Sequence, residues 1–198
     1  MRLAYLTTGL LTSGLLATAG CETDKPPTPA LRALSGTVDA TLPDEARTAV
    51  VIWEVSSGSP DYVYKFGEGT VSGGRLSITL PSDPPAEAIN AYGLGVGLVA
   101  VLVPGVTMPD GKVAAGLSAA DILAGVSPDR SVIWRAETFD FGGATPPADF
   151  WPSDFPPGLS CGACTPRPDG GSFDGFAPAA CDGIQVTAFG TADVCNWT

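Results

Sequence analysis

Glycine and proline set the first limit on how this chain can fold. The sequence contains 25 glycines and 19 prolines among 198 residues, well above the usual combined share of about 12%. They are spread between short apolar runs, so they predict turns between short elements rather than one long disordered tract. After residue 20 no long apolar run with helical spacing follows. We therefore expect an all-β fold.

Short apolar or alternating segments predict the individual strands. The clearest pair is 61–66 and 75–80, which alternate between apolar and polar residues, and the intervening Gly73-Gly74 supplies the positive φ angles of a hairpin turn. Further strands are expected at 34–42, 48–55, 91–103, 131–139 and 184–189. Short helices are predicted at 83–90 and 118–126, and a Pro-rich loop at 142–160.

The spacing of these segments indicates the architecture. Seven or eight short strands separated by Gly/Pro turns are typical of an antiparallel sandwich or barrel. We predict an antiparallel β-sandwich of seven to eight short strands, with one or two short helices and a disulfide-stapled C-terminal segment.

Three alternating glycines mark one face of the predicted strand 91–103. Because side chains alternate along a strand, Gly93, Gly95 and Gly97 fall on the same face and leave it bare. We expect an aromatic ring or another backbone segment to lie against this face. Nucleotide binding is not favoured, because the spacing is GxGxG and a strand rather than a helix continues from it.

The N-terminus has the pattern of an export signal. Arg2 precedes an apolar run that is shorter than the roughly 20 residues of a membrane-spanning helix, and small residues follow it. The ending Leu-Leu-Ala-Thr-Ala-Gly-Cys21 resembles the lipobox of bacterial lipoprotein signal peptides, with Thr18 where that family usually has Leu. The resemblance implies that residues 1–20 are removed as a signal peptide and that Cys21 is the lipid-attachment site. An ordinary cleaved signal followed by an unrelated cysteine is the alternative.

Lipidation of Cys21 would fix where the protein is found. The resemblance implies a diacylglycerol and an N-acyl chain on this residue, and two or more chains anchor a protein stably to a membrane. Residues 21–33 then form the lipidated cysteine and a Pro-rich tether, and residues 34–198 form a single β-domain. Glu22 replaces the Asp that retains some lipoproteins at the inner membrane, so we expect the outer membrane or the cell surface.

Four further cysteines predict the disulfide-stapled segment. An exported chain whose Cys21 carries lipid still has an even number of thiols, at Cys161, Cys164, Cys181 and Cys195. A bridge between Cys161 and Cys164 would close a very small loop, so each is expected to pair with a distant thiol. We predict Cys161–Cys181 and Cys164–Cys195, with the swapped pairing as the alternative. A four-cysteine zinc site and a redox CxxC are the other readings of these residues.

The composition excludes several classes of function. The chain has no histidine, which removes Ser-His-Asp and Cys-His catalysis and His-ligated zinc. Its formal net charge of −11 argues against binding nucleic acid or an anionic membrane surface. We assign no catalytic residue, no cofactor and no metal from the sequence.

Three weaker groups of residues complete the candidates. Aromatic side chains on one exposed face would suit stacking on sugar rings, and the candidates are Tyr62, Tyr64, Trp134, Phe150, Trp151 and Phe155. Two nearby carboxylates would suit glycoside hydrolysis, and the candidates are Glu54, Glu137, Asp140, Asp149 and Asp154. The acidic, Gly-rich segment 169–175 offers oxygen ligands for Ca²⁺ but lacks the spacing of an EF-hand loop.

Three segments together resemble the uncharacterised exported lipoproteins of myxobacteria: GTVSGGR at 69–75, GLGVGL at 93–98, and the tail GLSCGAC…FDGFAPAAC at 158–181. The resemblance implies a cell-envelope β-domain and assigns no activity. We therefore expect a lipid-anchored, non-enzymatic interaction or structural domain with an envelope protein or a glycan as partner. A carbohydrate-binding module is the alternative, followed by a hydrolase that uses carboxylates without histidine.

Overall fold

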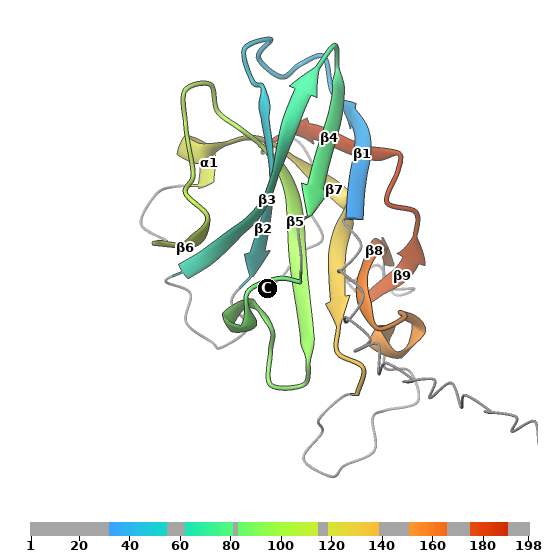
Figure 1. Ribbon diagram of the computed structural model, residues 1–198. Coiled ribbons are helices and arrows are strands. Elements are labelled where there is room, and N and C mark those ends of the chain that lie inside the picture. Colours follow the sequence, from blue (N-terminus) through green and yellow to red (C-terminus); the bar gives the residue numbers. More distant parts are fainter. Residues whose placement is uncertain are drawn as a thin grey trace, which may run out of the picture.

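The structure, a computed structural model, describes residues 32–54, 62–80, 83–114, 119–138, 151–165 and 175–189 (Figure 1). Its strands are β1 Arg32–Val38, β2 Thr48–Glu54, β3 Tyr62–Ser72, β4 Arg75–Leu80, β5 Leu94–Leu102, β6 Gly111–Ala114, β7 Leu123–Arg135, β8 Gly158–Thr165, β9 Gly175–Ala179 and β10 Ile184–Ala188. Its helical elements are α1 Ala119–Ile122 and the 3-10 turns η1 Ala86–Ala88 and η2 Trp151–Asp154. In these ranges no helix has the length and hydrophobicity needed to span a membrane.

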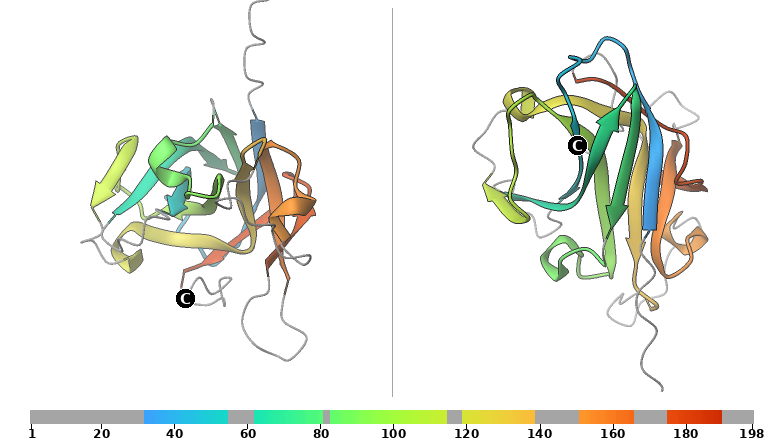
Figure 2. Two further views of the ribbon diagram at one scale, coloured as in Figure 1. Left: turned by 90° about the horizontal axis from the view of Figure 1, so that it is seen from below. Right: turned by 45° about the horizontal axis from the view of Figure 1, so that its top comes forward.

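Seven strands close into a barrel, so the predicted sandwich is wrong although the all-β class is confirmed. The strand order is β10-β1-β4-β3-β2-β5-β7, and the ring closes where β7 pairs with β10 through Val126 and Thr187. The β1–β10 pair is parallel and includes Gly36 opposite Ile184. The two views in Figure 2 show the strands arranged around one axis. An alternating pattern tells which face of a strand is buried, but it does not tell whether the first and last strands meet.

A bulge in β7 joins the barrel to two additional strands. The register between β5 and β7 shifts between Leu98 and Ala100, so residues 127–130 of β7 lie opposite a single β5 residue. Pro128 sits in this irregular stretch, where a missing backbone donor is tolerated. Before the bulge β7 pairs with β10, and after it β7 pairs with β8, which in turn pairs with β9.

The two predicted helices are mostly absent. In the segment 118–126 the helix α1 ends at Ile122, and β7 begins at the next residue. Gly125 and Val126 pair with β5 on one side and with β10 on the other, and these tertiary pairings outweigh a weak local helix preference. The segment 83–90 contains only the short turn η1.

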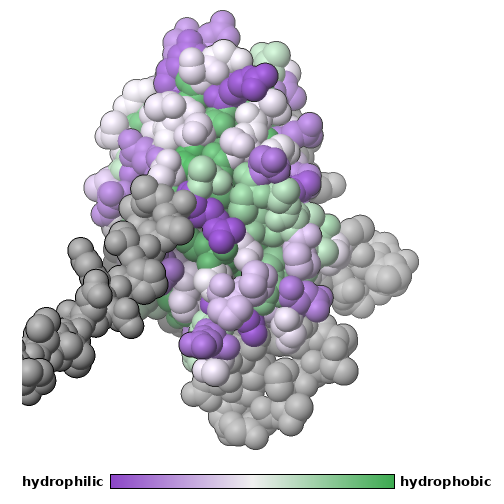
Figure 3. Space-filling model, turned by 45° about the vertical axis from the view of Figure 1, so that its right-hand side comes forward, coloured by the Kyte–Doolittle hydropathy of each residue, from purple (hydrophilic) through white to green (hydrophobic). Residues whose placement is uncertain are grey.

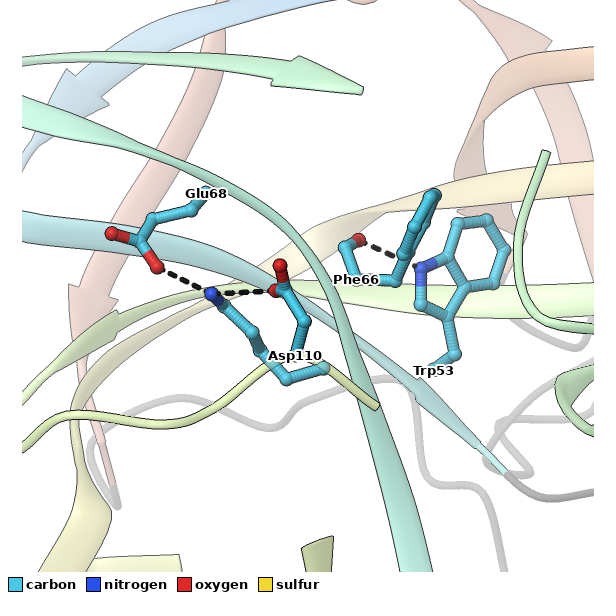
Figure 4. Close-up of polar contacts among 5 residues, drawn as sticks. Trp53, Phe66, Glu68 and Asp110 are labelled. Atoms are coloured by element: carbon cyan, nitrogen blue, oxygen red, sulfur yellow. Dashed lines mark hydrogen bonds and ion pairs between the residues drawn. The ribbon is translucent and has the colours of Figure 1, made fainter. Parts of the chain in front are cut away.

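Trp53 fills the bare face of the alternating glycines, as predicted. A Cβ atom added to Gly97 would lie 2.7 Å from Val51 Cγ1 and 3.1 Å from the Trp53 ring. The Trp53 side chain is fully buried, and its indole N–H donates to the Phe66 carbonyl oxygen at 3.1 Å (Figure 4). Gly93 was expected to lie in the same strand as Gly95 and Gly97. It instead precedes β5 and has a φ angle of +86°.

Apolar clusters fill the barrel and cover part of its outside. The interior cluster includes Leu34, Val51, Trp53, Ile78, Val101, Val132 and Ile184. A second cluster covers outward residues of β2, β5 and β7, and its members include Val50, Ala100, Leu102, Met108 and Val126. A third packs Phe155, which follows η2, and Phe176 of β9 over Leu94 of β5 and Ile133 of β7. The outer face of β10, β1, β4 and β3 contributes to neither outer cluster.

Candidate functional site

Short polar side chains occupy most outward positions of this uncovered part of the barrel, and the exposed Ala33, opposite Thr79, is an apolar exception. On β1, β4 and β3 they follow the same pattern, in which a buried or small residue separates two exposed hydroxyl residues. Ser77 and Thr79 on β4, for example, flank Ile78, which is buried in the barrel. We define the hydroxyl face as the exposed residues Ser35, Thr37, Thr70, Ser72, Arg75, Ser77, Thr79 and Gln185.

The strand register arranges the hydroxyl face in rows. One row is Ser35, Ser77 and Thr70, and the next row is Gln185, Thr37, Arg75 and Ser72. Neighbouring strands lie about 4.8 Å apart, and outward residues of one strand are separated by about 7 Å. The side chains therefore form a two-dimensional array across four strands. Figure 3 brings forward the side of the molecule that lies on the right in Figure 1; its upper part is mainly white and purple, and its middle includes a green, hydrophobic area.

Glycines bring β3 and β4 close enough to build these rows. Gly73 and Gly74 form the two-residue turn with φ +57 and +71, as predicted for this hairpin. A Cβ atom on Gly69 would lie 1.8 Å from the Ser77 carbonyl oxygen, so only glycine allows this approach. Thr70 is thereby held opposite Ser77.

The hydroxyl face carries little charge in a strongly acidic protein. The chain has 21 acidic and 10 basic residues, yet Arg75 is the one charged member of the face. Its guanidinium forms no ion pair with any residue in the described ranges. Glu68 is the acidic residue that pairs in register with a member of the face, opposite Thr79, and its carboxylate is paired with Lys65.

Lys65 and two carboxylates border the hydroxyl face beside Thr79. The Lys65 side chain is 3% exposed, and its ammonium contacts the Glu68 carboxylate and lies 2.8 Å from Asp110 Oδ1 (Figure 4). Burial by itself would lower the pKa of the Lys65 ammonium, but the hydrogen bonds and charges of Asp110 and Glu68 outweigh burial and raise this pKa. Lys65 is therefore charged at neutral pH. The three residues and Thr79 help to line an open cavity of about 380 Å³.

A second cavity lies at the hairpin end of the face. Its volume is about 430 Å³, and its lining includes Leu42, Val71, Gly73 and Gly74 together with charged residues Asp39, Asp44 and Arg47. The Thr41 backbone N–H donates to Asp39 Oδ1 at 2.8 Å, and this hydrogen bond lowers the pKa of the Asp39 carboxyl. Asp39 is therefore ionised at neutral pH. The hydroxyl face thus lies between two hollows with charged rims.

The Cys161–Cys181 bridge is confirmed and lies beside this face. The two Cα atoms are 5.2 Å apart, and the Cys181 carbonyl oxygen accepts the Ser35 N–H at 3.0 Å. The bridge thus connects β8 to the segment that is hydrogen-bonded to Ser35, the residue of β1 just before its pairing with β10 begins at Gly36. Cys164 is also disulfide-bonded, but Cys195 lies outside the described residues, so Cys164–Cys195 stays a prediction. Cys21 also lies outside them.

The predicted aromatic platform is not found among the described side chains. Tyr64 and Phe155 are 9% and 2% exposed, and Trp134 is half-buried against the interior cluster. Phe150 and the side chains of Tyr62 and Trp151 lie outside what the structure describes. The described members of the set therefore pack in the protein rather than forming a surface for sugar rings.

The predicted carboxylates and the acidic loop are only partly described. Glu137, which follows β7, and Asp154 in η2 are exposed, and Glu54 lies in β2. Asp140, Asp149 and residues 169–174 lie outside the described ranges. Within those ranges no group of three or more His, Cys, Asp or Glu residues is placed to hold a metal ion.

Sequence reasoning missed the hydroxyl face, although a signal for it was present. The pattern Ser/Thr-x-Ser/Thr occurs at Ser35-Gly-Thr37, Thr70-Val-Ser72 and Ser77-Ile-Thr79. Each repeat says which side chains share a face of its strand, but only the strand register places the three repeats side by side. Comparison of the chain with protein-family models, curated proteins and solved structures gives no match.

Proposed function

We propose that the protein is a lipid-anchored, non-enzymatic interaction module of the cell envelope that presents the hydroxyl face to a partner. The observation that carries this proposal is the uneven covering of the barrel. Apolar clusters cover outward parts of β2, β5, β7 and β8, whereas β10, β1, β4 and β3 expose eight ordered polar side chains. The paired strands hold these side chains at regular spacing on one surface.

The anchor is supported by the N-terminal sequence. The lipobox-like ending at Cys21 and the Pro-rich residues 22–31 precede β1, which begins at Arg32. Prolines in a linker favour its use as a spacer. The barrel would then stand clear of the lipid headgroups, with the outer membrane or the cell surface as its location.

The other functions have less support. Sugar binding through stacked aromatic residues needs exposed rings, and the described candidates Tyr64 and Phe155 are buried. A carboxylate-dependent hydrolase needs an acid and a second carboxylate close together, and no observation in the described ranges favours such a pair over the hydroxyl face.

Substitution of the proposed lipid-attachment residue tests the anchor. We expect the wild-type protein to partition into the detergent phase of a Triton X-114 extraction and to incorporate labelled fatty acid. Cys21→Ser should lose the label and either move to the aqueous phase or accumulate with its signal peptide, because no other residue can accept the lipid. Cys195→Ser is the matched control and should partition like the wild type. Equal detergent partitioning of Cys21→Ser and the wild type would refute the anchor.

A further inference from the structure

We infer that residues 103–114 form a strap that opens locally from the barrel, and that the ion pair between Lys65 and Asp110 is the latch that keeps the strap closed. The strap follows β5 and ends with β6. The inference does not depend on the lipid anchor or on the hydroxyl face, because it concerns how the strap is attached to β3.

The strand at the end of the strap is attached along a single edge. β6 lies outside the ring of the barrel and, in the part of the chain that the structure describes, pairs with β3 alone. Its four residues lie opposite Tyr62–Lys65, beyond the part of β3 that pairs with β4 (Figure 1). Every strand of the ring, in contrast, has two neighbours. A short strand with one neighbour belongs to the parts of a protein that open at low free energy.

The part of the strap before β6 is held to the barrel by apolar packing. Residues 104–109 make no backbone hydrogen bond to a barrel strand in the described ranges. Met108 is 7% exposed and belongs to the second apolar cluster, and Val106 packs against that cluster. Gly105 and Gly111 have φ angles of +81° and +97°, and a Cβ atom added at either would meet nothing within 4 Å. These glycines are two points where the backbone can turn without disturbing packed neighbours.

Lys65 fastens the strap where β6 begins. Lys65 lies opposite Gly111, the first residue of β6. Its ammonium contacts Glu68 of its own strand and lies 2.8 Å from Oδ1 of Asp110, which belongs to the strap (Figure 4). The Lys65 side chain is 3% exposed, and a buried cation that loses a partner destabilises the conformation that buries it. The ion pair therefore favours the closed strap.

Opening of the strap uncovers an apolar surface on the outside of the barrel. Val50 of β2 and Ala100 of β5 are fully buried members of the cluster that Met108 completes. When the strap leaves, Met108 leaves with it, and part of this cluster becomes accessible. The latch thus sets how often the apolar surface is exposed.

Hydrogen–deuterium exchange followed by mass spectrometry tests the strap on the full-length protein in a neutral detergent. In the wild type we expect peptides that cover residues 103–114 to exchange faster than peptides that cover β5. Asp110→Asn keeps the side-chain size but removes the charge, and it should accelerate exchange in the strap about tenfold. Exchange in β5 and the Tm should stay close to those of the wild type, because the opening is local. Unchanged exchange in the strap, or equal acceleration in the strap and in β5, would overturn the inference.

A double-mutant cycle tests whether Lys65 and Asp110 act as one latch. Lys65→Met removes the buried cation and keeps an apolar stem, so Asp110→Asn in this background should accelerate exchange in the strap by no more than about twofold. Asp129→Asn is the matched control, because it removes an exposed carboxylate that lies 3.8 Å from Arg130 Nε, and it should leave the strap unchanged. A full tenfold effect of Asp110→Asn in the Lys65→Met background would show that the ion pair is not the latch.

Discussion

Replacing Gly36 with alanine should lower the free energy of unfolding by about 3 kcal/mol, at the upper end of the usual cost of overpacking. A Cβ atom at this position would lie 1.9 Å from the Ile184 carbonyl oxygen, which is a backbone atom and cannot rotate away. The substitution must therefore push β1 and β10 apart where they pair. For a domain of this size, a loss of this magnitude lowers Tm by roughly 10 °C.

Ser35→Ala is the control for this experiment. Ser35 is the exposed neighbour of Gly36 on β1, and its substitution changes side-chain size without creating a backbone overlap. Thermal unfolding followed by circular dichroism compares the two variants. If Gly36→Ala were as stable as Ser35→Ala, β10 would not lie against Gly36, and the barrel would be open at this position.

Removal of the Cys161–Cys181 bridge should have a similarly large effect. The cysteines are 20 residues apart, and a bridge that closes a loop of this length stabilises a protein by about 3 kcal/mol through the entropy of the unfolded chain. The double variant Cys161→Ala/Cys181→Ala should therefore unfold at a lower urea concentration. It also releases the segment whose carbonyl oxygen accepts the Ser35 N–H, so amide exchange at Ser35 should accelerate.

Chemical reduction provides the control for the cysteine variant. Under reducing conditions the wild type should lose stability, while the double variant should change only through its remaining disulfide at Cys164. Peptide mapping without reduction should recover Cys161–Cys181 and the predicted Cys164–Cys195. A recovered Cys161–Cys164 bridge, or four free thiols, would contradict the account of this segment.

Strands with strong local patterns were predictable from the sequence. The predicted 75–80 coincides with β4, and 48–55 and 184–189 match β2 and β10 to within one residue at the C-terminal end. These segments combine alternation or continuous apolar character with neighbouring turn residues, and such signals are local. The pairing of Cys161 with Cys181 was also predicted from local features. A Cys161–Cys164 loop would be very small, and the turn-rich segment before Cys181 can bring it back beside Cys161.

Features that depend on distant contacts were not predictable. The start of β7 has a weak helical pattern, but pairing with β5 and β10 makes it a strand. Strand β8 contains Gly162 and β9 contains Pro178, so both have low intrinsic strand preference and were missed. Barrel closure and the hydroxyl face depend on the same information, namely which strands become neighbours.

The measurement that tests the closed barrel most directly is a nuclear Overhauser experiment on the isotope-labelled protein. The pairings β10–β1, β1–β4 and β4–β3 build the outer face, and the additional pairing of β10 with β7 closes the sheet into a barrel. We predict contacts from β10 to both neighbours, between Gln185 and Thr37 of β1 and between Thr187 and Val126 of β7. Contacts from β10 to β1 alone, with none to β7, would show an open sheet and contradict the account.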